Sequence, residues 1–174
     1  MNDTNLLRNK QILVVDDERD IVESLVDLLE MCRVDTAADF ETAQKYLAIY
    51  TYDAAIFDIM GVDGYQLLKI ARQKNIPALM LTAHAMSPDN LIKSIKGGAH
   101  AYLPKDKMAD IETYLLDLIK AKQNGQKHSK SWFSRLKPFF DQKFGHGWRE
   151  KDRPFWQDFD KALVVSREEL EEIL

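Results

Sequence analysis

Five short apolar segments alternate with five amphipathic segments over residues 1–122, and this alternation restricts the fold more than any other feature of the chain. Gln11–Val15, for example, is an apolar run that ends in acidic residues, as expected for a buried parallel strand. The segments between them repeat apolar side chains at helical spacing, as Leu67, Leu68 and Ala71 do within Gly64–Gln73. The predicted strands are Gln11–Val15, Val34–Ala37, Asp53–Phe57, Ala78–Leu81 and Ala101–Leu103.

Strict alternation of strands and helices predicts an α/β fold, because each short connection must return the chain through a helix to a parallel neighbour. The expected architecture is a doubly wound, five-stranded parallel sheet of flavodoxin-like order 2-1-3-4-5, followed by a short helical C-terminal extension. Ser87 and Pro88 have the residue types of a helix N-cap and first turn, and Gly97-Gly98 ends that helix. Apolar spacing from Ile21 to Cys32 predicts another helix with Cys32 in the core.

Charged and polar residues follow four of the five predicted strands. They are Asp16, Asp17 and Glu18 after the first strand, Asp58 after the third, Thr82 after the fourth and Lys105 after the fifth. In doubly wound sheets the ligand site lies at the carboxyl ends of the strands, so these side chains should meet. One Asp at a strand end is common in turns and would mean little alone. The complete set favours a functional site.

Close carboxylates need a counter-charge, since each like-charged pair costs about 4 kcal/mol at ~4 Å and an effective dielectric of ~20. A hard cation such as Mg²⁺ (or Mn²⁺) supplies it through oxygen ligands, and Lys105 supplies a second positive charge. These parts suit phosphoryl transfer to an Asp carboxylate, with the metal and Lys105 neutralising the phosphoryl oxygens. A hydroxyl from Thr82 can donate a hydrogen bond to one of those oxygens.

Residues 10–122 resemble the receiver domain of two-component response regulators. The resemblance is carried by four motifs in order, Ile12-Leu13-Val14-Val15-Asp16-Asp17-Glu18, Ile56-Phe57-Asp58, Leu79-Met80-Leu81-Thr82-Ala83 and Tyr102-Leu103-Pro104-Lys105. It implies that Asp58 is the phosphoacceptor and that Lys105 and Thr82 contact the phosphoryl group. It also implies that Tyr102 is the switch aromatic, which turns inward when Thr82 engages the phosphate.

The same resemblance implies the metal ligands. Asp17 would hold Mg²⁺ directly, Asp16 would lie close by and act partly through water, and Asp58 and the backbone carbonyl of Met60 would complete the protein ligands. One departure concerns the segment from Asp58 to Gly64, which lacks the family's Met-Pro and is about two residues shorter. His84 either tunes the phosphoryl lifetime or is an ordinary exposed loop residue. His100 is predicted to be a surface residue.

The remainder of the chain has a different composition. Residues 123–130 are polar and are predicted to be a linker, and residues 123–153 hold eight Lys and Arg against three Asp and Glu. Nine of the 17 aromatic residues fall between Trp132 and Phe159, which is too apolar for a solvated tail. We therefore expect residues 131–174 to form two or three short helices, with one starting at Asp152-Arg153-Pro154 and one at Ser166.

Three roles are open for this extension: packing on its own receiver or on a second copy, docking to another protein, or binding nucleic acid or an anionic membrane. The first is favoured, so a homodimer is a candidate and nucleic acid is a poor one. The chain is expected to be a phosphorelay response regulator with output through protein contact. The alternatives are a transcription regulator with a minimal DNA-binding tail and a phosphate-independent scaffold, against which the intact site argues.

The expected partners are a histidine kinase or histidine phosphotransfer protein and a downstream protein that the sequence does not identify. No enzymatic activity is expected beyond the receiver's own phosphoryl transfer and dephosphorylation. No apolar run approaches the ~20 residues that cross a bilayer, and the first ten residues have no signal-like apolar segment. With Cys32 as the single cysteine, these features favour a cytoplasmic location.

Overall fold

The structure is a computed structural model that describes residues 3–84, 86–125 and 131–161. The chain divides into two compact units, Met1–Trp132 and Phe133–Leu174. Each unit is considered by itself. None of the helices in the described ranges is long and apolar enough to cross a membrane.

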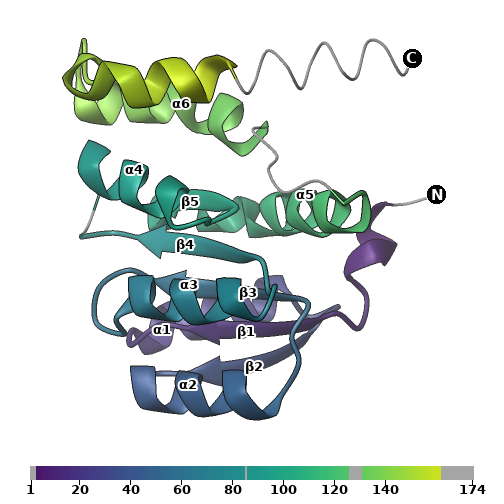
Figure 1. The fold of residues 1–174 in the computed structure, drawn as a ribbon. Coiled ribbons are helices and arrows are strands. Elements are labelled where there is room, and N and C mark those ends of the chain that lie inside the picture. Colours follow the sequence, from purple (N-terminus) through teal and green to yellow (C-terminus); the bar gives the residue numbers. More distant parts are fainter. Residues whose placement is uncertain (1–2, 85, 126–130, 162–174) are drawn as a thin grey trace. The chain divides into compact units, whose positions relative to one another are not determined.

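A parallel sheet of five strands forms the centre of the first unit, in the order β2-β1-β3-β4-β5 (Figure 1). This confirms the predicted order. The strands are β1 Gln11–Val15, β2 Arg33–Ala37, β3 Ala54–Asp58, β4 Ala78–Thr82 and β5 Ala101–Pro104. Every residue of β3, β4 and β5 is buried, whereas the edge strand β2 is buried fully only at Ala37. The continuous apolar runs therefore mark the strands that are covered on both faces.

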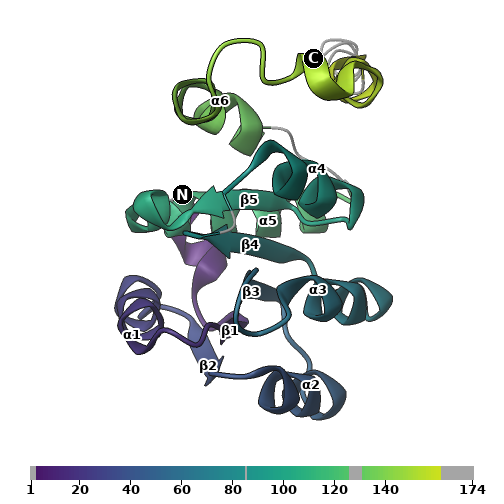
Figure 2. The ribbon, with the colours of Figure 1, turned by 90° about the vertical axis from the view of Figure 1, so that its left-hand side faces the viewer.

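Helices cover both faces of the sheet (Figure 2). Helices α1 and α5 pack against each other on one face, and α2, α3 and α4 lie on the other. Their bounds are α1 Arg19–Leu28, α2 Phe40–Ile49, α3 Gly64–Gln73, α4 Pro88–Lys96 and α5 Ile111–Gln123, with 3-10 turns η1 at Asp3–Leu7 and η2 at Lys105–Asp110. This arrangement leaves the carboxyl ends of the strands open at one edge, where the site lies.

Local side-chain contacts explain where two of these helices begin. The Ser87 hydroxyl accepts a hydrogen bond of 3.1 Å from the Asn90 backbone nitrogen, and Pro88 occupies the first turn of α4, as predicted. At α2 the Asp39 carboxylate accepts a 2.7 Å bond from the Thr42 nitrogen. That charged bond to a backbone N–H lowers the pKa of Asp39.

The prediction for Cys32 is wrong in its element. Helix α1 ends at Leu28, and Cys32 follows it directly before β2. The half-buried thiol donates a 3.3 Å hydrogen bond to the carbonyl of Leu7, and burial raises the pKa of the thiol to about 11. The helical spacing of apolar residues continues beyond the end of α1, because Cys32 is also partly buried. It packs beside the N-terminal turn η1 and not along α1.

The second unit is built from helical segments rich in aromatic side chains. Helix α6 spans Ser131–Phe144 and contains Pro138, a 3-10 turn η3 spans Glu150–Asp152, and residues 153–161 are helical. The predicted helix start at Asp152-Arg153-Pro154 is confirmed. The predicted helix at Ser166 lies outside the described residues, as do residues 126–130 of the predicted linker.

Aromatic rings of the second unit contact one another directly. Phe133 stacks on Trp156 with ring centroids 5.3 Å apart, and Phe140 stacks on Phe144 at 5.6 Å. Trp148 meets Trp156 edge to face at 5.2 Å. Pairs of this geometry add about 0.5–1.5 kcal/mol each beyond the area that they bury. The aromatic-rich extension is therefore an ordered helical unit, at least through residue 161.

Candidate functional site

The strand register brings the predicted site residues to one edge of the sheet. Val15 pairs with Phe57, so Asp16 and Asp58 follow paired positions of β1 and β3. Asp58 pairs with Leu81, and Thr82 pairs with Pro104, the residue before Lys105. Side chains that are up to 89 residues apart in the chain thus emerge at neighbouring strand ends.

Lys105 is the centre of this cluster. Its Nζ lies 2.9 Å from Asp16 Oδ2, 2.9 Å from Glu18 Oε1 and 3.2 Å from Asp58 Oδ1. The Lys105 side chain is only 7% exposed, and Asp16 and Asp58 are 1% and 5% exposed. One ammonium group therefore faces three carboxylates, two of them buried, which leaves the cluster short of positive charge.

The electrostatics of the cluster follow from this shortage. Burial, and then the neighbouring Asp16 charge, raise the pKa of Asp58 to about 6. Burial likewise raises the pKa of Asp16, although a bond from the Glu18 nitrogen and the Lys105 charge oppose it. Burial alone would lower the pKa of Lys105, but its ion pairs with Glu18 and Asp16 raise it. Lys105 is therefore a permanent cation at neutral pH, while Asp58 titrates near neutrality.

A divalent cation fits the chemistry of this donor set. Oxygens of Asp16, Asp17 and Glu18 all lie within 4.8 Å of one another. Although Lys105 Nζ is 2.9 Å away, the buried Asp16 Oδ2 accepts no hydrogen bond of good geometry from the described residues. Carboxylate oxygens around a hard cation, completed by water, are the usual Mg²⁺ ligands. Asp58 stands outside this group of three, and its inclusion among the ligands stays a prediction.

The loop from Ile59 to Asp63 passes beside the Asp17 carboxylate. Ile59 and Val62 are buried, whereas the side chain of Met60 is 58% exposed. Gly61 and Asp63 have positive φ values of 87° and 54°. Lys105, and to a smaller extent the exposed His84, lower the pKa of Glu18.

Thr82 and Tyr102 form the second part of the site. Thr82 is 1% exposed and its side chain is hydrogen-bonded to the hydroxyl of Tyr102. The Tyr102 ring is fully buried and therefore points inward. Burial raises the pKa of Tyr102, so the phenol stays neutral. The two residues are thus in contact, while their role in switching stays a prediction.

The ion pair between Glu18 and Lys105 spans 87 residues and agrees with the expectation that the side chains after the strands meet. The pairing of His100 was not predicted. His100 was predicted to be a surface residue, yet its side chain is only 7% exposed and its Nε2 lies 2.9 Å from Asp117 of α5. A His with a carboxylate partner 17 residues away carries no local sequence signal.

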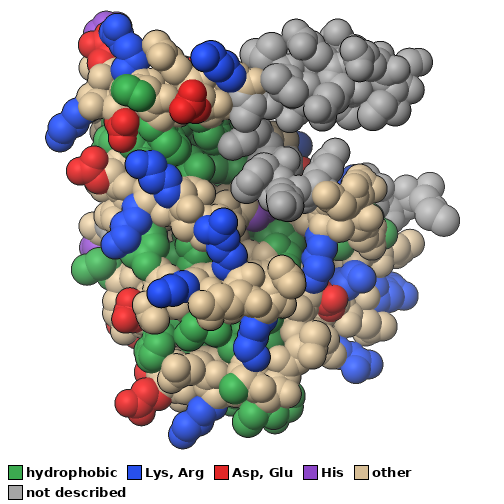
Figure 3. All heavy atoms as spheres, in the orientation of Figure 1, with side chains coloured by type: hydrophobic (Ala, Val, Ile, Leu, Met, Phe, Trp, Pro, Cys, Tyr) green, Lys and Arg blue, Asp and Glu red, His purple; other side chains and the backbone are tan. Residues whose placement is uncertain are grey.

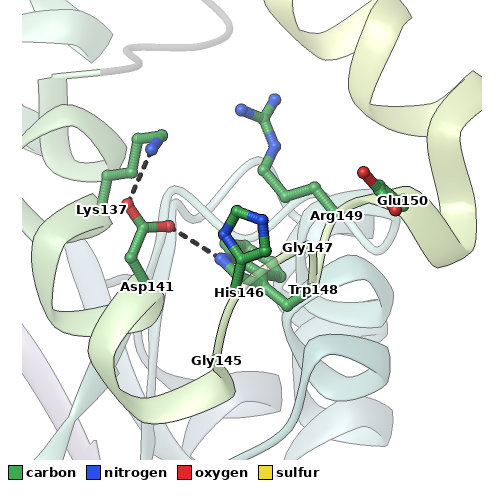
Figure 4. Close-up of a pocket in the computed structure, with 8 residues that line it drawn as sticks. All are labelled: Lys137, Asp141, Gly145, His146, Gly147, Trp148, Arg149 and Glu150. Atoms are coloured by element: carbon green, nitrogen blue, oxygen red, sulfur yellow. Dashed lines mark hydrogen bonds and ion pairs between the residues drawn. The ribbon is translucent and has the colours of Figure 1, made fainter.

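A pocket of about 440 Å³ lies in the second unit (Figure 4). Lys137 bonds to Asp141 at 2.8 Å, and Asp141 also accepts a 2.8 Å bond from Trp148 Nε1. Arg149 is paired with Asp160 at 2.7 Å. Because these cations already have carboxylate partners, they are poorly suited to binding an anion in the pocket. The strand-end cluster is therefore the better candidate for the functional site. The pocket is lined by Lys137, Asp141, Gly145, His146, Gly147, Trp148, Arg149 and Glu150.

Two bacterial transcriptional regulatory proteins are similar to this chain in sequence. PhoP of Bacillus subtilis strain 168, an alkaline phosphatase synthesis transcriptional regulatory protein, is 39% identical over 103 residues, covering 56% of this chain and 42% of PhoP. CpxR of Escherichia coli K12, a transcriptional regulatory protein, is 37% identical over 100 residues, covering 55% of this chain and 42% of CpxR. The chain thus spans less than half the length of these relatives.

Solved receiver domains superpose on the first unit. The Francisella response regulator 1452 receiver domain has 30% identity and a TM-score of 0.59, covering 66% of this chain and 99% of that one. A receiver domain protein from Clostridium thermocellum has 28% identity and a TM-score of 0.58, covering 66% and 97%. The family model of the response regulator receiver domain matches residues 12–115, more than half of the 174 residues. This chain therefore belongs to the response regulator receiver family of two-component systems.

Proposed function

We propose that Asp58 accepts a phosphoryl group from a histidine kinase or a histidine phosphotransfer protein in a reaction that requires Mg²⁺ or Mn²⁺. The observation that carries this proposal is the position of Lys105, whose Nζ lies within 3.2 Å of both Asp16 and Asp58 at the strand ends. A buried cation beside a buried carboxylate is suited to neutralising the charge of a phosphoryl group that is transferred to that carboxylate.

In this reaction an ionised oxygen of Asp58 attacks phosphorus, and the bond from phosphorus to the donor's imidazole nitrogen breaks. The electron pair of that bond leaves with the imidazole, which departs neutral because the donor ring is protonated beforehand. Lys105 attracts the phosphoryl oxygens, and a Thr82 hydroxyl can donate to one of them after releasing Tyr102. The product is a mixed anhydride, an acyl phosphate on Asp58.

Asp16 and Asp17 would hold the metal, together with Asp58 and the carbonyl of Met60. When bound, the cation would neutralise charge that develops on the phosphoryl oxygens. It would also supply the positive charge that the carboxylate cluster lacks with Lys105 alone. Apart from this self-phosphorylation and the later hydrolysis of the acyl phosphate, we assign no enzymatic activity to the chain.

Output is proposed to run through protein contact. PhoP and CpxR are named transcriptional regulatory proteins, but this chain spans only 42% of each. Figure 3 shows Lys and Arg side chains spread over the visible face of the first unit rather than gathered into one basic patch. Lys137 and Arg149 of the second unit are paired with acids. A phosphorylation-dependent, salt-sensitive gel shift with DNA would instead support a transcription regulator.

Mass spectrometry of the intact protein tests the phosphoacceptor. Incubation with acetyl phosphate and Mg²⁺ should add one phosphoryl group, and Asp58→Asn should abolish the addition. Asp53→Asn is the matched control, since Asp53 bonds to the Gln11 nitrogen at the opposite end of β3. Full labelling of Asp58→Asn would disprove the assignment.

Removal of the metal tests the second part of the proposal. EDTA or Asp17→Ala should stop phosphorylation while far-ultraviolet circular dichroism stays unchanged, because Asp17 is exposed and supports no core packing. Restoring Mg²⁺ should recover labelling of the wild type but not of Asp17→Ala. Labelling at an unchanged rate in EDTA would show that no metal is needed.

A further inference from the structure

Gly61 lies closer to the side chain of Asp17 than any other residue type would allow. A Cβ atom built on Gly61 would lie 2.4 Å from Asp17 Oδ2 and 2.7 Å from Asp17 Cγ. Real Cβ atoms essentially never approach other atoms below 3.0 Å, so any side chain here requires something to move. The backbone of Gly61 therefore packs so closely against the Asp17 carboxylate that no side chain fits between them.

The loop itself cannot withdraw to make room. Ile59 and Val62, on either side of Gly61, bury their side chains, and the Ile59 nitrogen donates a 3.1 Å bond to the carbonyl of Leu81. At the end of the loop a Cβ on Gly64 would lie 2.1 Å from the carbonyl oxygen of Asp58. The loop is thus fixed on both sides of Gly61, and its end packs directly on the backbone of Asp58.

Asp17, in contrast, is free to move. It is exposed, and rotation about its side-chain torsions would turn the carboxylate into solvent at little cost. An added Cβ at Gly61 would consequently displace the Asp17 carboxylate and leave the loop in place. Displacement would separate Asp17 from the oxygens of Asp16 and Glu18, with which it now forms a group within 4.8 Å.

We infer that Gly61 is a positioning residue of the metal site. Because Gly61 has no side chain, it leaves room for the Asp17 carboxylate to lie beside Asp16 and Glu18. This inference rests on the proposed Mg²⁺-dependent function. It predicts that Gly61→Ala impairs metal binding through Asp17, without removing any ligand and without disturbing the core. Octahedral Mg²⁺ and Mn²⁺ sites tolerate little displacement of a ligand, so the effect on affinity should be large.

Mn²⁺ affinity measured by electron paramagnetic resonance provides the first test. Gly61→Ala should weaken the affinity at least tenfold. The matched control is Gly145→Ala, because Gly145 has the same φ of 87° and none of the described residues has an atom within 4 Å of its would-be Cβ. This control carries the same backbone strain without the contact, and its affinity should stay within twofold of wild type.

Two further variants distinguish the effect of the contact between a residue-61 Cβ and Asp17 from the effects of backbone strain and of misfolding. Asn tolerates positive φ better than Ala but carries the same Cβ, so Gly61→Asn should fold and should lose a similar affinity. In an Asp17→Asn background, where the ligand is already impaired, Gly61→Ala should weaken Mn²⁺ binding by less than twofold more. Wild-type affinity in both Gly61 variants, or a full additional loss in the Asp17→Asn background, would overturn the inference.

A metal-free measurement distinguishes this inference from the proposed function. In EDTA, the side-chain carboxyl ¹³C resonance of Asp17 should shift in Gly61→Ala and not in Gly145→Ala. An unchanged resonance would refute the positioning role of Gly61 whatever the metal does. If the wild type bound no Mn²⁺ while the resonance shifted, the metal requirement would fail and the positioning of Asp17 would stand.

Discussion

The backbone nitrogen of Ser87 donates a hydrogen bond of 3.3 Å to the hydroxyl of Tyr102. Ser87 is the N-cap of α4, and Tyr102 lies on β5 with its ring fully buried. The same hydroxyl is hydrogen-bonded to Thr82 at the strand-end site. Tyr102 therefore connects the residue that would contact a phosphoryl group to the first turn of α4.

Thr82→Ala should uncouple α4 from the site. Without the hydroxyl, Asp58 should still accept phosphate, but the state of the site would no longer alter the bond that Tyr102 accepts from Ser87. Coupling of this kind is typically worth about 1–3 kcal/mol. Amide hydrogen exchange of residues 87–96, with and without acetyl phosphate and Mg²⁺, measures it.

Thr82→Ser is the matched control, because it keeps the hydroxyl and removes only a methyl group. It should retain most of the phosphorylation-dependent change in exchange. A response in Thr82→Ala as strong as in wild type would rule out this route between Asp58 and α4.

Asp58 should make the metal-free receiver less stable as the pH rises. Burial raises its pKa from 3.8 to about 6 in the folded state, so ionisation is more costly when the chain is folded. The destabilisation is absent below pH ~4, grows between pH 4 and 6 and is constant above. In EDTA, Asp58→Asn should therefore increase the free energy of unfolding at pH 7.5 by about 1–3 kcal/mol and change it little at pH 4.

Urea unfolding followed by circular dichroism at the two pH values tests this dependence. Asp27→Asn, on the exposed surface of α1, is the control and should give no comparable gain. Equal effects of Asp58→Asn at both pH values would mean that titration of the carboxyl is not the cause.

The hydroxyl of Tyr65 on α3 should stabilise α4 through hydrogen bonds. Its hydroxyl lies 3.0 Å from both the carbonyl and the side-chain oxygen of Asn90 and accepts a 3.4 Å bond from Ser94. Tyr65→Phe keeps the ring beneath Lys93 but removes these bonds, which should cost about 1 kcal/mol. Amides of α4 should then exchange faster, whereas Tyr50→Phe, at an exposed tyrosine, should leave them unchanged.

The sheet and the strand-end cluster could be predicted because their signals are local. Short strand-like segments mark each strand to within a residue or so, and their alternation with helices predicts a doubly wound parallel sheet. The cluster follows, since the carboxyl ends of parallel strands share one edge. Asp16, Asp58 and Lys105 meet for this reason, although the register that sets their distances had to come from the structure.

Contacts that depend on exact backbone paths were not predictable. The end of α1 at Leu28 carries no Gly or Pro signal, so the apolar spacing misleadingly extended the helix to Cys32. The closeness of Gly61 to Asp17 depends on how a five-residue loop crosses the site. The pairing of His100 with Asp117 joins the residue before β5 to α5 and produces no periodic pattern in the sequence.

The aromatic cluster of the second unit should fold and unfold cooperatively. Phe140 contacts the rings of Phe133, Phe144 and Trp148, with centroids 5.6–6.4 Å apart. Phe→Ala in a core costs about 3–5 kcal/mol, and a unit of roughly 40 residues rarely has more than that to lose. Phe140→Ala should therefore unfold this unit.

Tryptophan emission follows this event, because Trp148 and Trp156 lie in the second unit and Trp132, the remaining tryptophan, directly precedes it. Phe140→Ala should shift the emission to longer wavelength, while Asp58 is still phosphorylated by acetyl phosphate. Phe139→Ala, at a half-buried neighbour, should shift it less.

Truncation after Lys122 should likewise leave a folded receiver, and sedimentation of the full-length and truncated proteins would reveal whether the aromatic unit mediates self-association. Wild-type emission from Phe140→Ala would contradict a cooperative aromatic core, because loss of the central ring would then leave the cluster intact.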